Sequence, residues 1–238
     1  FAQRLLNVKN DHRFDIKQEV IAKSGFWVTK KRYGQWIIND GGVNCDKLDV
    51  KGLDIVRSNF PPAFRDLMTF VLKSILNKVD KDTIDDKILK FKKEMKTTPI
   101  LDIALPTGVK GIKKYVDKKV RGFKSTTQFT NIKKGCPAHV RSAIRYNDLL
   151  KYYGKNKYEP IRNSDKIKWT YLKQNPFSLD KIAFKGYDDP KEIIDFIEKY
   201  IDYDQLFEGQ LKKKISMFYE ALNWSLPVDK KNTLERFF

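Results

Sequence analysis

The spacing of the apolar residues changes near Pro61, and this change constrains the fold of the chain more than any other feature. Before it, apolar and polar residues alternate, as in residues 48–51, which is typical of a strand with one buried face. After it, apolar residues recur three and four positions apart, as on one side of an α-helix. We therefore predict an α+β fold, in which a small antiparallel sheet is followed by a mainly helical domain with a short β-hairpin.

The first sixty residues are predicted to form the edge of a β-sheet, with a boundary near residues 59–61. Residues 14–17 and 48–51 alternate in polarity, and residues 27–38 precede Asn39-Asp40-Gly41-Gly42, a sequence typical of hairpin turns. The segment Lys30-Lys31-Arg32-Tyr33 is placed within a strand. From a strand, its cations can point toward phosphates while the other strand face stays packed.

Beyond the boundary the chain is predicted to be mainly helical. The first predicted helix opens with Pro61-Pro62, and a second follows Asp82 or Thr83 as its cap. Further helices start at Pro137 and at Asp189-Pro190, and a last amphipathic helix carries Leu206. Proline in the first helical turn and Asp or Thr at the cap are typical helix starts. Residues 167–171 and 182–184 are expected to pair as a hairpin. The tryptophans are expected in the core, at Trp27, Trp36, Trp169 and Trp224.

The charge of the chain is strongly positive and unevenly distributed. Its 48 Lys and Arg residues outnumber 30 Asp and Glu residues, for a net charge of +18. Residues 110–145 hold eleven basic residues and one acid, whereas residues 188–208 hold eight acids and two lysines. A field of this kind attracts polyanions. We therefore expect one face of the protein to bind DNA or RNA and another face not to bind it.

No catalytic centre is evident in the sequence. The two histidines and two cysteines have no partners at metal-ligand spacing, and phosphate-binding glycine loops and serine elbows are absent. The adjacent acids Asp85-Asp86 and Asp188-Asp189 are interpreted as helix-start or surface features rather than as a pair that binds metal. A reducing compartment is expected from the low cysteine content. No run approaches the roughly 18 apolar residues of a membrane span, so no membrane partner is expected.

Several segments occur in an order that resembles a known family. They are Gly25-Phe26-Trp27, Lys30-Lys31-Arg32-Tyr33, Val50-Lys51-Gly52-Leu53-Asp54, the segment 134–141, Asn175-Pro176-Phe177 and Ile201-Asp202-Tyr203. Together they resemble the C-terminal part of family B replicative DNA polymerases of the T-even tailed-phage type. The resemblance spans nearly the whole chain. It implies that residues 1–60 are the end of the palm, residues 61–226 the thumb and residues 227–238 a C-terminal tail.

The resemblance also implies a role for the basic residues. The Lys30–Tyr33 segment would sense the new duplex from its minor groove, and the thumb would grip primer-template DNA by its phosphates. The candidate DNA contacts are Lys30, Lys31, Arg32, Tyr33, Lys110, Lys113, Lys114, Lys133, Lys134, His139 and Arg141. For Lys133 to Arg141, the N-terminus of the Pro137 helix would add its dipole. Alternatively, Lys110, Lys113 and Lys114 only keep one face of a helix exposed to solvent, and the Lys30–Tyr33 segment only uses charge to protect an edge strand from aggregation.

The family's metal-binding aspartates, fingers helix and proofreading exonuclease have no counterpart in this sequence. The resemblance therefore implies that catalysis, with Mg²⁺, needs a separate N-terminal portion carrying the exonuclease, the fingers and the catalytic palm. No catalytic or metal-binding residue is assigned here. The N-terminal Phe1-Ala2-Gln3-Arg4 is not a signal peptide, and we expect the chain to be truncated at its front. The expected location is the cytoplasm, that of the host cell if the protein is viral.

The C-terminus carries a further candidate site. A short helical turn would bring Leu234, Phe237 and Phe238 together as one apolar plug. This arrangement resembles the tail by which replicative polymerases bind a sliding clamp, although Lys231 stands where glutamine is usual. Alternatively, the aromatic residues fold back onto the thumb. Two functions stay open at this point: part of a DNA polymerase, or a stand-alone, non-enzymatic module that binds and tethers duplex DNA.

Overall fold

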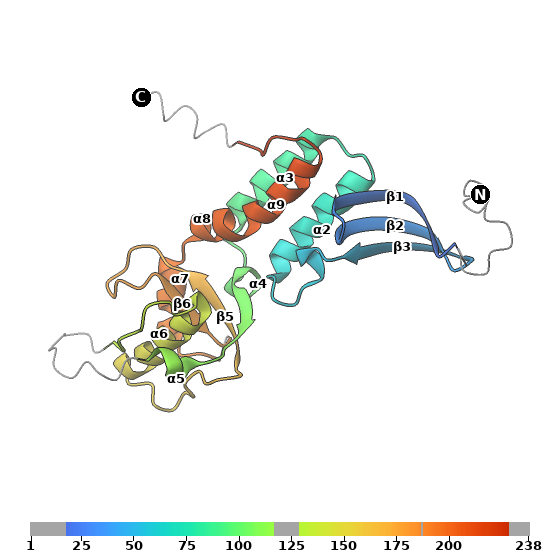
Figure 1. The fold of residues 1–238 in the computed structure, drawn as a ribbon. Coiled ribbons are helices and arrows are strands. Elements are labelled where there is room, and N and C mark those ends of the chain that lie inside the picture. Colours follow the sequence, from blue (N-terminus) through green and yellow to red (C-terminus); the bar gives the residue numbers. More distant parts are fainter. Residues whose placement is uncertain (1–17, 117–128, 187, 229–238) are drawn as a thin grey trace, which may run out of the picture.

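The structure, a computed structural model, describes residues 18–116, 129–186 and 188–228. Within these residues it has two antiparallel three-stranded sheets, in the orders β1-β2-β3 and β4-β5-β6, together with helices. The predicted α+β fold is therefore confirmed (Figure 1). The predicted strand at residues 14–17 and the C-terminal plug of Leu234, Phe237 and Phe238 lie outside the described residues.

The first sheet consists of β1 (Val20–Thr29), β2 (Arg32–Asp40) and β3 (Val43–Lys51). The predicted turn at Gly41-Gly42 is confirmed, because both glycines have positive φ, 59° and 91°. The placement of Lys30 and Lys31 within a strand is wrong, because these two residues form the turn between β1 and β2. Two-residue hairpin turns usually carry Asn or Gly, and the absence of both residue types hid this turn in the sequence.

One face of the first sheet packs against helices, and Trp27 on the other face is exposed. Phe26 on the inner face meets Phe218 of α9 (Lys213–Ala221) edge to face, with ring centroids 5.3 Å apart. Gly34 lies against Leu72 of α2 (Pro62–Leu76), and a Cβ at Gly34 would come within 2.7 Å of the leucine side chain. Trp27 lies on the opposite face, where 57% of its surface is exposed. The prediction of a buried Trp27 is therefore wrong, since residues 26 and 27 point to opposite faces of one strand.

The helices next to this sheet agree with their predicted apolar faces. Helix α2 begins after Pro61, as predicted, and buries Phe64, Leu67 and Leu72. Helix α3 (Lys81–Glu94) begins two or three residues earlier than predicted, because the cap is Asp80, whose carboxylate accepts a hydrogen bond from Thr83 N–H at 2.8 Å. The last predicted helix forms as a continuous run of α8 (Tyr203–Leu206), the π-helical turn η2 (Phe207–Lys212) and α9.

The second sheet consists of β4 (Leu105–Gly108), β5 (Lys166–Tyr171) and β6 (Lys181–Phe184). The predicted hairpin of β5 and β6 is confirmed, but β4 was not predicted. It is four residues long and contains Pro106, and proline is typical of edge strands rather than of strand interiors. Helix α6 (Ala138–Tyr152) follows Pro137 as predicted and packs against β6.

The short elements α4 (Ile100–Ile103), α5 (Ile112–Tyr115) and η1 (Asp54–Val56) lie between the longer ones, and α7 (Lys191–Tyr200) follows β6. Asp189 does not cap α7, contrary to the prediction, and it is buried rather than on the surface. Its carboxylate accepts the hydroxyl of Tyr146 at 2.5 Å and the amide of Lys185 at 2.5 Å. Tertiary packing thus gives this acid another set of donors.

The elements gather at two ends of an elongated molecule (Figure 1). The first sheet lies with α2, α3 and α9 at one end, and β5, β6, α5, α6 and α7 lie at the other. The chain crosses between the ends at α4 and again at α8, so the C-terminal helix α9 returns to the first sheet. None of the helices in the described part of the chain has the length and apolar character needed to cross a membrane.

Candidate nucleic-acid interface

Two basic segments that are distant in sequence lie side by side in the fold. Val116 forms an antiparallel β-bridge with Ile132, and the amide of Lys133 donates to the carbonyl of Tyr115 at 2.9 Å. This pairing places Lys113 and Lys114 of α5 beside Lys133 and Lys134. The two basic segments predicted separately from the sequence are therefore neighbours in the fold.

We call Lys113, Lys114, Lys133, Lys134 and Arg141 the basic surface. The four lysines are exposed and Arg141 is half-buried. No salt bridge joins any of the four lysines to another residue in the described ranges. Lys110 is also exposed and directly precedes α5. The basic surface therefore presents cations that are available to an anionic partner.

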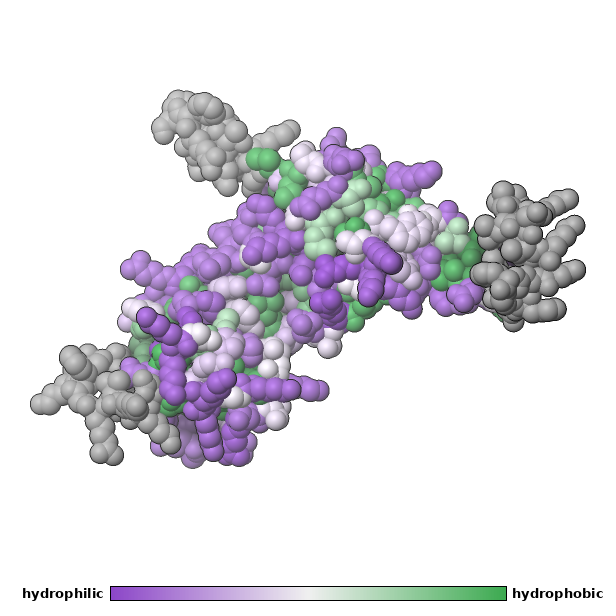
Figure 2. All heavy atoms as spheres, in the orientation of Figure 1, coloured by the Kyte–Doolittle hydropathy of each residue, from purple (hydrophilic) through white to green (hydrophobic). Residues whose placement is uncertain are grey.

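Part of the basic surface borders a cleft of about 590 Å³. The lining residues are Phe129, Asn131, Ile132, Lys133, Lys134, Arg141, Arg145, Phe177, Ser178, Leu179 and Asp180. They come from the segment before α6, from α6 itself and from the loop between β5 and β6. The cleft thus combines cations with two phenylalanine rings. Figure 2 shows polar side chains over much of the visible face of this end of the molecule.

A buried acid holds the segment that carries Lys133 and Lys134. The Asp148 side chain is 2% exposed and accepts hydrogen bonds from the Thr130 amide at 3.1 Å, the Thr130 hydroxyl at 2.5 Å and Arg145 Nη1 at 2.9 Å. Arg145 also donates to the Thr130 carbonyl at 2.8 Å. Because three donors meet the Asp148 carboxylate and one of them is a cation, this buried charge is compensated. Sequence reasoning missed Asp148, although an acid at an apolar helix position is a recognisable signal.

Arg141 reaches into the cleft from α6 and shares an acid with a neighbouring lysine. Its Nη1 lies 3.3 Å from Asp180 Oδ2, and Lys181 Nζ lies 2.6 Å from the same atom. Burial acts to raise the pKa of Asp180, but the hydrogen bond and charge of Lys181 and the charge of Arg141 outweigh it and lower the pKa. Exposed ion pairs contribute little stability, so Arg141 can exchange Asp180 for a phosphate at small cost.

His139 differs from the other predicted DNA contacts. It is half-buried in the first turn of α6 and does not line the cleft. Burial lowers its pKa below the ordinary value of about 6.5. His139 is therefore mainly neutral at pH 7 and adds little positive charge to the basic surface at that pH.

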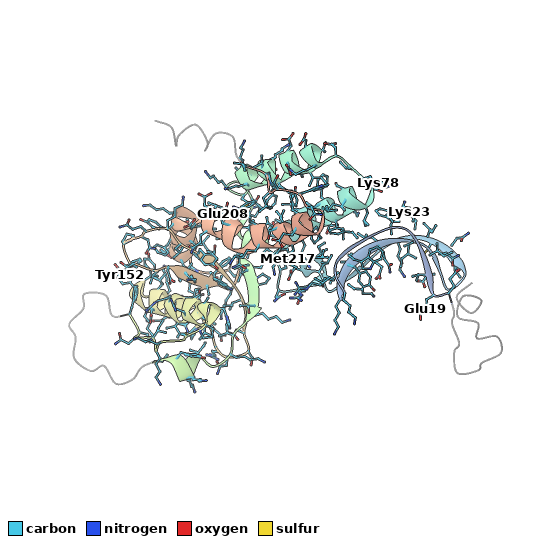
Figure 3. All side chains as sticks on the ribbon, turned by 45° about the horizontal axis from the view of Figure 1, so that its top comes forward. Glu19, Lys23, Lys78, Tyr152, Glu208 and Met217 are labelled. Atoms are coloured by element: carbon cyan, nitrogen blue, oxygen red, sulfur yellow. The ribbon has the colours of Figure 1, made fainter. Side chains whose placement is uncertain are left out.

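The Lys30–Tyr33 segment lies in the first sheet, at the turn of the β1–β2 hairpin next to α9. Lys30 and Lys31 are exposed, whereas Arg32 turns toward α9 and places Nη1 3.7 Å from the sulfur of Met217. Tyr33 stacks on Trp27 with ring centroids 6.3 Å apart. Figure 3 shows Tyr152, which lies near the cleft, at one end of the molecule and Met217 near its middle. The hairpin and the basic surface are thus two separate groups.

Gly52, at the end of β3, lies in close backbone contact with the β1–β2 turn that carries Lys31. The Gly52 backbone has φ +67° and lies directly against the Lys31 carbonyl oxygen, which a Cβ at position 52 would approach to 2.1 Å. Tyr33 pairs with Lys51 across β2 and β3. The close backbone approach therefore requires glycine and fixes the turn against the end of β3.

The described residues contain no group of three His, Cys, Asp or Glu side chains that could hold a metal ion. The side chains present therefore do not fit the Mg²⁺ that a polymerase uses, and we derive no chemical step through it. Among the described residues, the groups that can do chemistry here are cations, backbone amides and aromatic rings. Groups of these kinds can contact phosphates and bases.

Comparison with known proteins gives an independent result. No curated protein matches the chain significantly. The family model described as DNA polymerase family B matches residues 1–222, which includes every strand and helix of the structure. The family of the resemblance is thereby confirmed at the level of family B. The match extends from before β1 to the end of α9 and takes in both groups of cations, and we conclude that the chain belongs to DNA polymerase family B.

Proposed function

We propose that this chain is the C-terminal palm and thumb portion of a replicative DNA polymerase of the T-even phage type, which grips primer-template duplex through phosphates and the minor groove. The family match supports DNA polymerase activity and DNA as the partner. In this proposal, residues 1–60 complete the palm, residues 61–226 form the thumb and residues 227–238 bind a sliding clamp through Leu234, Phe237 and Phe238.

The observation that carries the proposal is the pairing of Val116 with Ile132, which joins the two basic segments into one surface. A duplex presents phosphates at regular spacing, and a row of lysines neutralises several of them at once. The match to DNA polymerase family B favours this function over the stand-alone tethering module. The Lys30–Lys31 turn supplies further exposed cations on the palm side.

In this proposal the nucleotidyl transfer, with its Mg²⁺, takes place on an N-terminal portion that carries the exonuclease, the fingers and the catalytic palm. The test is a primer-extension assay in which a separate chain with those parts is added to the full 238-residue chain. Restored extension supports the proposal. Duplex binding without any restored extension would instead support the tethering module.

DNA gripping is tested by the salt dependence of duplex binding. Replacing Lys133 and Lys134 together by alanine should reduce the slope of log K against log salt by up to about 1.8, because each phosphate contact contributes about 0.9. The matched control replaces Lys90 and Lys93, two exposed lysines of α3, and should leave the slope unchanged. Equal slopes for both double variants would contradict gripping by the basic surface.

A further inference from the structure

A cluster of aromatic rings adjoins the cleft that Lys133 and Lys134 border, and two of its rings line the cleft. Phe177 lies at the centre of the cluster. The centroid of the Phe177 ring lies 5.6 Å from Phe129, 4.9 Å from Tyr152, 6.4 Å from Tyr153 and 5.4 Å from Phe196. Phe129 and Phe177 line the cleft. Tyr152, beside Phe177, keeps 54% of its surface exposed.

The loop that carries Phe177 is held in place by a buried amide. Asn175 is 8% exposed, and its Nδ2 donates to the carbonyls of Lys173 at 2.8 Å and Leu179 at 2.6 Å. Its Oδ1 accepts the amides of Phe177 and Leu179, each at 3.2 Å. A loop with this many internal hydrogen bonds presents its ring in one position, so little conformational entropy is lost when a ligand contacts Phe177.

The cleft therefore offers two kinds of contact at one place. Lys133, Lys134 and Arg141 supply positive charge, and Phe129 and Phe177 supply ring surface. A volume of about 590 Å³ lies within the range of small-molecule sites, which is about 300–1,000 Å³. A nucleotide has a matching pair of features, an anionic phosphate and a flat base. In a duplex the bases are stacked on each other, so a duplex can use the cations but not the rings.

We propose that the cleft binds an unpaired nucleotide of single-stranded DNA, with its phosphate at Lys133, Lys134 and Arg141 and its base against Phe177. Tyr152 offers a ring to the next base. Lys113 and Lys114 extend the positive charge beyond the cleft, which suits consecutive phosphates of a strand better than a free nucleotide. This inference rests on the proposed function, since it adds a single-strand site to a duplex-gripping surface.

A second cavity of the molecule provides a contrast. Its volume is about 340 Å³ and its lining is also partly aromatic, with Tyr146 and Tyr158. Its charged lining includes Glu159, Asp188 and Asp189, with Lys185 as a cation. The excess of acids repels a polyanion. Tyr158 is 39% exposed and is therefore a suitable control for Tyr152, as an exposed tyrosine beside a cavity of opposite charge.

The test compares a single-stranded oligonucleotide with a blunt duplex that has the same number of phosphates, both bound to the full chain. Tyr152→Ala and Phe177→Leu should each weaken single-strand binding about tenfold, because base–aromatic stacking contributes that order of affinity. Both variants should leave duplex affinity unchanged, and Tyr158→Ala should change neither affinity. Unchanged single-strand affinity in both cleft variants, or an equal loss for single strand and duplex, would overturn the proposal.

A cross-link gives a second readout that does not depend on the stability of a variant. An oligonucleotide with 5-iododeoxyuridine at one unpaired position is bound to the unmodified chain and irradiated. The expected cross-linked peptide contains Tyr152 or Phe177, and cross-links confined to other peptides overturn the assignment. If single strands bind with this ring dependence while the chain does not bind duplex, the proposed duplex grip fails and the single-strand site stands.

Discussion

Replacing Gly52 by alanine should disrupt the β1–β2 turn, and the structure allows the effect to be estimated. Gly52 has φ +67°, and its added Cβ would lie 2.1 Å from the carbonyl oxygen of Lys31. A left-handed φ costs a residue with a Cβ about 1–2 kcal/mol. The contact is about 0.9 Å shorter than the 3.0 Å below which Cβ atoms essentially never approach, and relieving such overpacking costs about 1–3 kcal/mol more.

The matched control is Gly41→Ala in the other turn of the same sheet. Gly41 has φ +59°, but no atom lies within 4 Å of its added Cβ. Gly41→Ala should therefore lower the free energy of unfolding only by the cost of the left-handed φ, about 1–2 kcal/mol. Gly52→Ala should lower it by about 2–5 kcal/mol. The difference between the two variants isolates the contact between the Gly52 and Lys31 backbones.

The assay is thermal unfolding followed by circular dichroism, with urea unfolding to obtain the free energy. In a chain of this size, each 1 kcal/mol shifts Tm by about 2–4 °C, so Gly52→Ala should unfold several degrees below Gly41→Ala. Equal Tm values would refute the reasoning, because they would mean that the Lys31 carbonyl moves away without cost.

Two further predictions concern residues around α6. Asp148→Ala should lower the free energy of unfolding by about 3 kcal/mol, since it leaves the largely buried Arg145 without its carboxylate. Asp148→Asn keeps an acceptor and should lower the free energy, measured by urea unfolding, by about half as much. Equal losses for the two variants would show that the charge of Asp148 is irrelevant to stability. Burial lowers the pKa of His139 below its ordinary value of about 6.5, so below pH 6.5 the unfolded chain binds more protons and stability falls as pH falls. His139→Gln should remove that part of the pH dependence and leave duplex affinity at pH 7.5 unchanged; a weaker affinity at pH 7.5 would mean that His139 contacts DNA directly.

Local sequence patterns predicted the elements whose signals are continuous along the chain. The apolar spacing after Pro61 gave α2, Pro137 marked the start of α6, and the alternation of residues 167–171 gave β5. The Asn39–Gly42 turn was found because glycine is the residue type that takes positive φ most readily, and both glycines do so in the structure. Each of these signals depends on residues that are neighbours in sequence, so the sequence was sufficient to detect them.

Predictions were wrong where the deciding partner lies far away in sequence. Asp189 looked like a helix cap, but Tyr146 binds its carboxylate from another helix. Trp27 looked like a core residue because it is large and apolar, yet its face of the sheet is exposed. The Lys30-Lys31 turn has none of the usual turn residues, and contact with the Gly52 backbone helps to define it.

The sequence by itself determined the amounts of charge and apolar surface, the helical periods and the excess of cations in residues 110–145. Only the tertiary structure decided that Lys113 and Lys114 lie beside Lys133 and Lys134, and that Phe177 joins Arg141 in one cleft. The physical reason is that secondary structure follows from local residue spacing and backbone conformation, whereas a binding surface depends on long-range packing. A charge pattern along the chain does not specify which segments meet in space.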